Sequence, residues 1–547
     1  ITVSGSRSVT LEHVAVSGAG AGIRIENSAD VEVVSSVLAA SGGAQLILRG
    51  ETPGFWSEFN ASAVGNGAPL ADTPQGKAVG LDAWRTMRGL DRESHPVALA
   101  DFVAPERGDY RIVEGRRLAF SGRYGKAVGP HSVRAPPVSR EAIERVEVIS
   151  TTRTSANLSW WTPGRITGTM LEWGKTPEYA HTYDRGARDW GEYETFHTVS
   201  LIGLAPETTY HFRVGFRDHA TEDDYADNEF AIVRTTKQKG LIWSGDYAFT
   251  TAARDPEPRR LYVSLDGDDA NDGLTPATAW RSVDQASRKA RAGDIVTIAP
   301  GRYRELLRPL QTGTSEDRRI VFRAERPFTV FLDGGFVRDG GPARSHTVQL
   351  MGKAFINMEN LVCEKGGHMD NGGYRGWPGY AGLILVSGST GIEVKACVMD
   401  GRHRFMCGLV AQGLAAMPGS PEPEDVAPLT ASDNLFVGNW FALYVGGRGP
   451  NIFRHNAFVR GRVLMAAFDA ETVLRNNIYQ SLGSNKFGNN LFIHPARMDS
   501  DYNCFGWDAE NDRRKVASID GRRREFASGL AGWREAFKQD LNSIESD

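Results

Sequence analysis

The sequence predicts an all-β protein in which two β-solenoid modules flank a β-sandwich. Glycine makes up 61 of the 547 residues, about 11% against roughly 7% in an average protein, and with 25 prolines this favours a turn-rich β fold. Short β-branched segments recur with a period near 22 residues towards both ends of the chain. Between them lies a different pattern of strands, with a tyrosine positioned as in β-sandwich domains.

The composition argues against several classes of function. A formal net charge of −4 gives no general case for nucleic-acid binding. The four cysteines form no Cys-x-x-Cys pair, which excludes a disulfide-dense scaffold and disfavours a structural zinc site. No run reaches eighteen apolar residues, so no membrane span is predicted. Nothing in the composition indicates the oligomeric state.

Internal repeats define the two solenoid regions. Residues 9–16 match residues 31–38 at a spacing of 22, and five aligned positions in the C-terminal region are spaced 36, 37, 22 and 21 apart. These positions are Leu361, Cys397, Asn434, Asn456 and Asn477. A basic period lengthened by inserted loops is typical of a solenoid, and each rung alternates before turning at Gly, Asn or Asp. Asparagines at stacked inward turns can pair along the axis.

The two solenoid regions share an ending. LDAWRTMRGLDRES at 81–94 returns as LAGWREAFKQDLNS at 530–543, and SEFN at 57–60 returns as SDYN at 500–503. Trp84 and Trp533 each follow a leucine at helical spacing, which predicts residues that seal the end of a module. We therefore expect two related modules, both incomplete: 1–137 as the C-terminal part of the first, and 255–547 as a C-terminally truncated second.

The start of the second module resembles a known class of proteins. LYVSLDGDDANDGLTPATAW (261–280), AGDIVTIAPGRY (292–303) and GTSEDRRIVFR (313–323) are similar to the opening of secreted right-handed parallel β-helix proteins. That class includes polysaccharide lyases, some glycosidases and many members of unknown activity. The resemblance implies a right-handed parallel β-helix for both modules, more loosely for the first, and a secreted or cell-surface location. It is specific for fold and not for reaction.

A separate domain is expected at 139–253, between proline-rich segments at 134–137 and 254–258. SANLSW (155–160) has the pattern of a strand, and Tyr210 is placed as a tyrosine corner whose hydroxyl bonds back to the backbone. LEWGKTP (171–177) resembles the middle of fibronectin type III domains. The prediction is a fibronectin type III-like sandwich that serves as a spacer or docking module.

Aligned rungs predict a basic column on the second module. Residues at equivalent positions of adjacent rungs lie about 4.8 Å apart. Lys395, Arg454 and Arg475 share a column that Ser432 interrupts. Cations neutralise the carboxylate of a uronate, and a lysine or histidine of lowered pKa can remove its C5 proton. In a lyase that acts on uronate-containing polysaccharides, Lys395 is the candidate base and His403 is the second choice. Arg454 and Arg475 are then the neutralising groups.

A glycine-rich insertion after Glu364 is the strongest pointer to a binding site, because functional residues concentrate on loops carried by rigid scaffolds. The expected substrate-binding residues are His368, Tyr374, Arg375, Trp377 and Tyr380, together with Arg402. Their aromatic faces would stack on sugar rings. The alternative is a lid whose aromatic residues pack down on the solenoid.

Carboxylates offer two further hypotheses. Glu364, Asp370 and Asp400 are candidate calcium ligands, or the catalytic pair of a glycosidase, unless they only form turns. The loop at 266–273 also suggests calcium, but Ala270 replaces the third ligand of an EF-hand, which favours a capping loop.

The sequence favours extracellular recognition of an acidic polysaccharide, with cleavage by β-elimination as its possible chemistry. Two alternatives stay open: a non-catalytic surface, matrix or adhesion protein with β-helix spacers, and a β-helix glycoside hydrolase. An enzyme would gather Lys395, Arg454, His403 and the loop at 374–380 in one groove, whereas a structural protein would scatter them.

Overall fold

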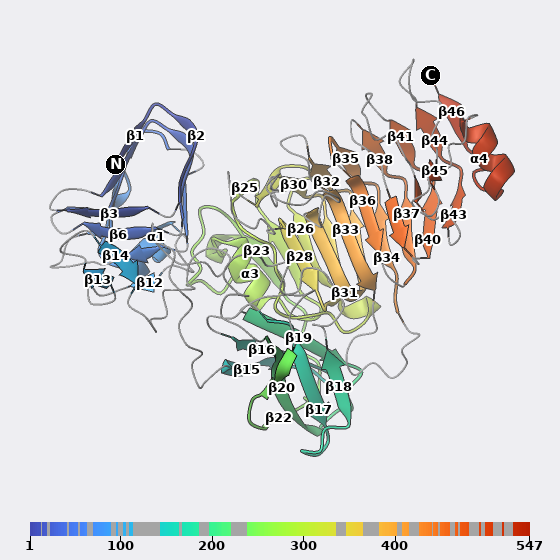
Figure 1. Cartoon of the computed structure of the whole chain (residues 1–547), viewed down its shortest axis with the longest axis horizontal. Coiled ribbons are helices and arrows are strands. Elements are labelled where there is room, and N and C mark those ends of the chain that lie inside the picture. Colours follow the sequence, from blue (N-terminus) through green and yellow to red (C-terminus); the bar gives the residue numbers. More distant parts are fainter. Residues whose placement is uncertain are drawn as a thin grey trace.

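The computed structural model (Figure 1) shows two β-helices and a β-sandwich. It describes residues 1–12, 14–18, 22–34, 36–40, 43–52, 55–58, 60–62, 69–88, 95–96, 102–104, 109–112, 143–162, 167–184, 196–219, 238–334, 346–364, 382–401, 407–414, 426–439, 441–446, 449–459, 465–468, 471–480, 492–493, 498–506, 517–518 and 529–546. The predicted fold class is confirmed. Among these residues no helix has the length and apolar character needed to cross a membrane.

The rungs of the second β-helix give strands to three parallel sheets, of which sheet I begins at the third rung (Figure 1). Sheet I contains β28 (Val348–Met351), the first half of β31 (Gly382–Lys395), β33 (Cys407–Leu414), β36 (Phe441–Gly446), β39 (Met465–Phe468), β42 (Phe492–Ile493) and β45 (Ala517–Ser518). Sheet II contains β23 (Arg260–Val263), β24 (Ile295–Ile298), β26 (Ile320–Ala324), β29 (Ala354–Glu359), the second half of β31, β34 (Leu429–Ser432), β37 (Asn451–Arg454), β40 (Thr472–Arg475) and β43 (Met498–Asp501).

Sheet III completes each rung. It contains β25 (Gly301–Tyr303), β27 (Val330–Asp333), β30 (Val362–Glu364), β32 (Val398–Asp400), β35 (Leu435–Val437), β38 (Ala457–Val459), β41 (Ile478–Gln480), β44 (Cys504–Gly506) and β46 (Ile544–Ser546). The chain passes from sheet I to sheet II at the I–II corner, then through a tight II–III turn. It returns to sheet I at the III–I corner.

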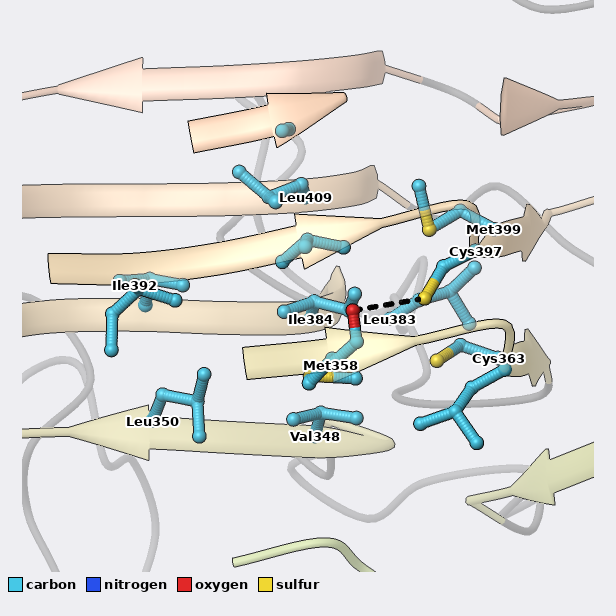
Figure 2. Packing of buried hydrophobic residues seen from close by; sticks show 14 of the residues in the cluster. Val348, Leu350, Met358, Cys363, Leu383, Ile384, Ile392, Cys397, Met399 and Leu409 are labelled. Atoms are coloured by element: carbon cyan, nitrogen blue, oxygen red, sulfur yellow. Dashed lines mark hydrogen bonds between the residues drawn. The ribbon is translucent and has the colours of Figure 1, made fainter. Parts of the chain in front are cut away.

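Alternating side chains fill the interior of the second β-helix. Figure 2 shows part of this core, where Met358 of β29, Ile384 of β31 and Cys397 of the turn that follows β31 all point inward. Burial raises the pKa of the Cys397 thiol to about 12, so the sulfur packs as a neutral apolar group. Further along, sheet III stacks four inward rings at centroid spacings of 4.8, 5.0 and 5.1 Å. These rings are Phe436, Phe458, Tyr479 and Phe505.

An asparagine ladder fixes the II–III turns. The Oδ1 atom of Asn456 accepts the backbone N–H of Asn434 at 3.0 Å, while its Nδ2 donates to the Ala431 carbonyl at 3.0 Å. The same pattern recurs at Asn477 and Asn503. The residue before each ladder asparagine has φ between +55° and +61°, a left-handed conformation that tightens the turn. The predicted stacking of asparagines is confirmed.

The opening segment of the second module forms the expected strand, capping helix and first rung. Strand β23 precedes α3 (Val283–Lys289), and β24 and β25 follow it. The Ser282 hydroxyl caps α3 by accepting the Gln285 N–H at 3.0 Å. Helix α3 therefore covers the first rung, as the resemblance to β-helix proteins implied.

The first β-helix is built in the same way. One sheet contains β1 (Thr2–Ser4), β4 (Ile23–Glu26), β7 (Leu46–Arg49), β10 (Ala71–Thr73) and β11 (Gly76–Ala78), and a second contains β2 (Arg7–Glu12), β5 (Ala29–Val34) and β8 (Trp56–Glu58). The third contains β3 (Ala15–Gly18), β6 (Val37–Ala40), β9 (Ala61–Ser62) and β12 (His95–Pro96). A hairpin of β13 (Phe102–Ala104) and β14 (Asp109–Ile112) follows.

The shared module ending is visible in the hydrogen bonds. Asn60 donates to the Ser57 hydroxyl at 3.0 Å, and Asn503 donates to the Ser500 hydroxyl at 3.0 Å. Trp84, on α1 (Leu81–Arg88), is fully buried, as expected of a residue that seals the module. The side chain of its counterpart Trp533, on α4 (Gly529–Phe537), lies outside the described residues.

The β-sandwich has two antiparallel sheets. One contains β15 (Glu144–Thr151), β16 (Ser155–Trp161) and β19 (Phe196–Ile202). The other contains β17 (Met170–Gly174), β18 (His181–Asp184), β20 (Thr209–His219), β21 (Gln238–Trp243) and β22 (Tyr247–Thr250). The tyrosine corner is confirmed, because the Tyr210 hydroxyl accepts the Ala205 N–H at 3.0 Å.

Removing one rung of the asparagine ladder should destabilise the second β-helix. In Asn456→Ala, the Asn434 N–H and the Ala431 carbonyl each lose a buried partner, which should cost roughly 2–4 kcal/mol. The shift of the urea unfolding transition measures this loss. The exposed-site variant Gln480→Ala should cost less than about 0.5 kcal/mol. Equal losses in both variants would contradict the structural role of the ladder.

Candidate functional site

The predicted basic column exists on the outer face of sheet II. Lys395 pairs in register with Ser432, Ser432 with Arg454, and Arg454 with Arg475. The side chains of Lys395 and Arg454 are exposed, whereas Ser432 is buried. Arg475 forms an ion pair with Asp499 at 2.5 Å. The column therefore presents two solvent-facing cations and a third that already has a carboxylate partner.

A column of carboxylates lies elsewhere, at the C-terminal ends of three consecutive strands of sheet III. Asp333, Glu364 and Asp400 are in register on β27, β30 and β32. Their exposed fractions are 0%, 4% and 5%. The same column continues through Val437, so the carboxylates occupy the three rungs that follow the rung of β25. The predicted proximity of Glu364 and Asp400 is thus realised in the backbone.

Two arginines compensate this buried negative charge. The Arg302 guanidinium forms ion pairs with both Asp333 (3.2 Å) and Glu364, and it lies 4.8 Å from the centre of the Phe331 ring. Arg304 approaches Asp333 at 3.8 Å. Burying ionised carboxylates is costly unless they are paired. The ion pairs explain how these rungs tolerate the charge.

Asp333, Arg302 and Arg304 were not among the residues predicted from sequence. The repeat pattern does indicate Asp333, because it follows an inward Leu332 just as Glu364 follows Cys363. The repeat alignment began at Leu361 and so did not reach the rungs that carry these three residues. Extending it by one rung towards the N-terminus would have found the aspartate.

The structure does not bring the basic and acidic columns to the same corner. Lys395 ends β31 just before the II–III turn, whereas Asp400 ends β32 at the III–I corner. The insertion at 365–381 is flanked by Glu364 and Gly382, which also lie at the III–I corner. The insertion thus adjoins the carboxylates in the chain and is separated from Lys395 by one strand of sheet III.

Several predicted site residues lie outside the described part of the chain. They are His368, Asp370, Tyr374, Arg375, Trp377, Tyr380, Arg402 and His403. Their proposed contacts with sugar, and the proposed role of Asp370 in binding calcium, stay predictions.

The described residues contain no group of three or more His, Cys, Asp or Glu side chains arranged to hold a metal ion. In the loop at 266–273, Asp269 accepts the backbone N–H groups of Arg281 and Ser282 at 3.0 and 2.9 Å. Asp272 accepts the Leu274 N–H at 2.9 Å, and this bond is the main reason that its pKa is lowered. These carboxylates act as turn and capping groups, the reading that the spacing favoured.

One known family matches part of the chain. Residues 143–251 match the purple acid phosphatase N-terminal domain, which coincides with the β-sandwich. No curated protein shows significant sequence similarity to the chain.

Solved structures resemble the chain in fold. A complex of XylC with xylose has a TM-score of 0.28 and 10% identity, covering 48% of this chain and 71% of that one. A family 28 exopolygalacturonase from Yersinia enterocolitica has a TM-score of 0.22 and 10% identity, covering 69% and 94%. A mutant of the PL6 family alginate lyase AlyGC has a TM-score of 0.29 and 9% identity, covering 98% and 73%. At these values the likeness concerns the fold alone.

Removing the Arg302 guanidinium should lower the free energy of unfolding, because the buried carboxylates lose a cation. Arg302→Met leaves Asp333 and Glu364 without this cation, and because the guanidinium is 40% exposed we expect a loss of roughly 1–3 kcal/mol at pH 7.

Urea unfolding of Arg302→Met at pH 7 measures this loss. Arg260→Met, which removes an exposed arginine from β23, is the matched control and should change stability little. Equal losses for the two variants would contradict the compensation of buried charge by Arg302.

Proposed function

We propose that the second β-helix binds a polysaccharide and hydrolyses it at the carboxylate column. The observation that carries the proposal is the register of Asp333, Glu364 and Asp400, three nearly inaccessible carboxylates on consecutive rungs. Such a concentration of buried charge costs stability, and sites that bear such a cost are commonly functional. Rungs repeating about every 4.8 Å also give the module a long, regular surface suited to an extended polymer.

The spacing of the column fits paired-carboxylate chemistry. Adjacent rungs place Glu364 and Asp400 about 4.8 Å apart at the backbone, close to the roughly 5–5.5 Å between the carboxyl groups of retaining glycosidases. In this proposal, Asp400 donates a proton to the leaving oxygen while Glu364 attacks the anomeric carbon and the glycosidic bond breaks. A water molecule that gives its proton back to Asp400 then displaces Glu364 and releases the sugar. The ion pair with Arg302 supports this role of Glu364, because the attacking group must be ionised.

A second candidate is β-elimination of an acidic polysaccharide. It is favoured by the exposed Lys395 and Arg454, which lie two rungs apart on the outer face of sheet II. In this reaction, Lys395 removes the C5 proton while Arg454 and Arg475 neutralise the uronate carboxylate, with calcium as a further option. The same column can serve a non-catalytic module as a binding track for acidic chains. Either function fits the secreted or cell-surface location that we propose.

Hydrolysis should depend on the carboxylate column. With a panel of neutral and acidic polysaccharides, we expect reducing ends to accumulate with the unmodified chain. Glu364→Gln and Asp400→Asn should each slow the release about 10²–10⁴-fold, the range for loss of a catalytic carboxyl group. Glu325→Gln, an exposed glutamate near the same rungs, should retain the rate. Undiminished release by both column variants would exclude this site.

β-Elimination has a separate optical signature. Unsaturated uronate absorbs near 232 nm, and on alginate, pectate or glycosaminoglycans a rise that Lys395→Ala abolishes would establish the second candidate. Under the hydrolytic proposal we expect new reducing ends without this absorbance. If neither signal appears with any substrate, the non-catalytic alternative is favoured.

A further inference from the structure

A chain of polar side chains joins the sandwich to the second β-helix. Ser200 donates to Asn157 at 2.7 Å, Asn157 to Ser150 at 3.0 Å, and Ser150 to Gln311 of the β-helix at 2.7 Å. At its other end, the Lys353 ammonium donates to the Ser200 hydroxyl at 3.3 Å. The chain of hydrogen bonds thus starts and ends on the β-helix and crosses the sandwich between.

The outer face of the sandwich sheet is buried at this contact. Leu158 and Trp160 point into the sandwich core, so Asn157 points away from it. Asn157 and Ser200 are nevertheless 1% and 0% exposed. A sheet face with polar side chains is normally open to water, so its burial shows that the β-helix covers it.

Lys353 is the most costly member of this interface. It follows β28 at the I–II corner and is 2% exposed, although lysine is almost never fully buried. Its ammonium also donates to the Leu310 carbonyl at 2.9 Å. Because one of its hydrogen-bond partners, Ser200, belongs to the sandwich, undocking would remove a hydrogen bond from this buried charge.

Further hydrogen bonds join the sandwich and the linker to the second β-helix. Arg308 donates to the Phe196 carbonyl at 3.2 Å and lies 5.6 Å from the centre of its ring. The linker itself is held, since Arg318 donates to the Pro256 carbonyl at 2.9 Å and Asp255 accepts the Arg153 N–H at 3.0 Å. The proline-rich segment at 254–258 is therefore not a free hinge.

We infer that the sandwich and the second β-helix form one rigid unit, latched by the buried Lys353 ammonium. The sandwich is a brace on the I–II corner of the first rungs and not a flexible spacer. Figure 1 shows β16 and β19 on the side of the sandwich that faces the β-helix. This inference does not depend on the proposed reaction.

Hydrogen–deuterium exchange of the full chain tests the latch. Docking stabilises the sandwich by linkage, so losing it should accelerate exchange in the strands of the sandwich. In Lys353→Met, which keeps the aliphatic stem, we expect amides of β16 and β19 to exchange about tenfold faster. Lys289→Met, which replaces an exposed lysine of α3, should leave these strands unchanged.

Ser200→Ala supplies the reciprocal test and guards against misfolding of the lysine variant. It removes the Lys353 partner from the sandwich side, so exchange in β28 and β29 of the β-helix should accelerate. If each substitution changes exchange only within the module that carries it, the two modules move independently and the inference is overturned.

Discussion

The pairing of asparagine side chains with the backbone at the II–III turns is the interaction on which the second β-helix depends. Each amide accepts an N–H from the preceding rung and donates to a carbonyl of that same rung, as at Asn456. A slip of one residue would break these bonds and turn the inward rings of sheet III towards solvent. The ladder therefore fixes the register, and the register determines which side chains share a column.

Both candidate sites follow from that register. On sheet II it produces a solvent-facing row of cations, which costs little because exposed charges stay hydrated. On sheet III it stacks three carboxylates with almost no access to water, and Arg302 spans two of them. Burying the three carboxylates lowers the stability of the fold more than exposing the cations does. That contrast is why the carboxylate column, and not the basic one, is the stronger candidate for chemistry.

Much of this architecture could be predicted from the sequence, because local repetition encodes it. The spacing of Asn434, Asn456 and Asn477 predicted the rungs, the inward ladder and the basic column, but only Glu364 and Asp400 of the carboxylate column. The spacing could not show which corner each column occupies, since that depends on where the chain bends. Lys395 and Asp400 are five residues apart in sequence, yet they belong to different sheets.

The sequence could not predict contacts between residues that are far apart in the chain. Arg302 meets Glu364 across two rungs, and neither residue type is unusual for an exposed strand. The docking of the sandwich depends on Lys353 and Ser200, which are 153 positions apart. In the sequence, that lysine looks like any solvated surface residue. Only the fold reveals that its ammonium is buried and shared between domains.

A crystal structure of the Glu364→Gln chain soaked with an oligosaccharide from the panel would test the central claim most directly. We predict sugar density at the III–I corner, with a glycosidic oxygen within hydrogen-bonding distance, about 3 Å, of Asp400. Sugar bound along Lys395 and Arg454 with the carboxylate column empty would contradict the hydrolytic account. That result would move the site to the outer face of sheet II.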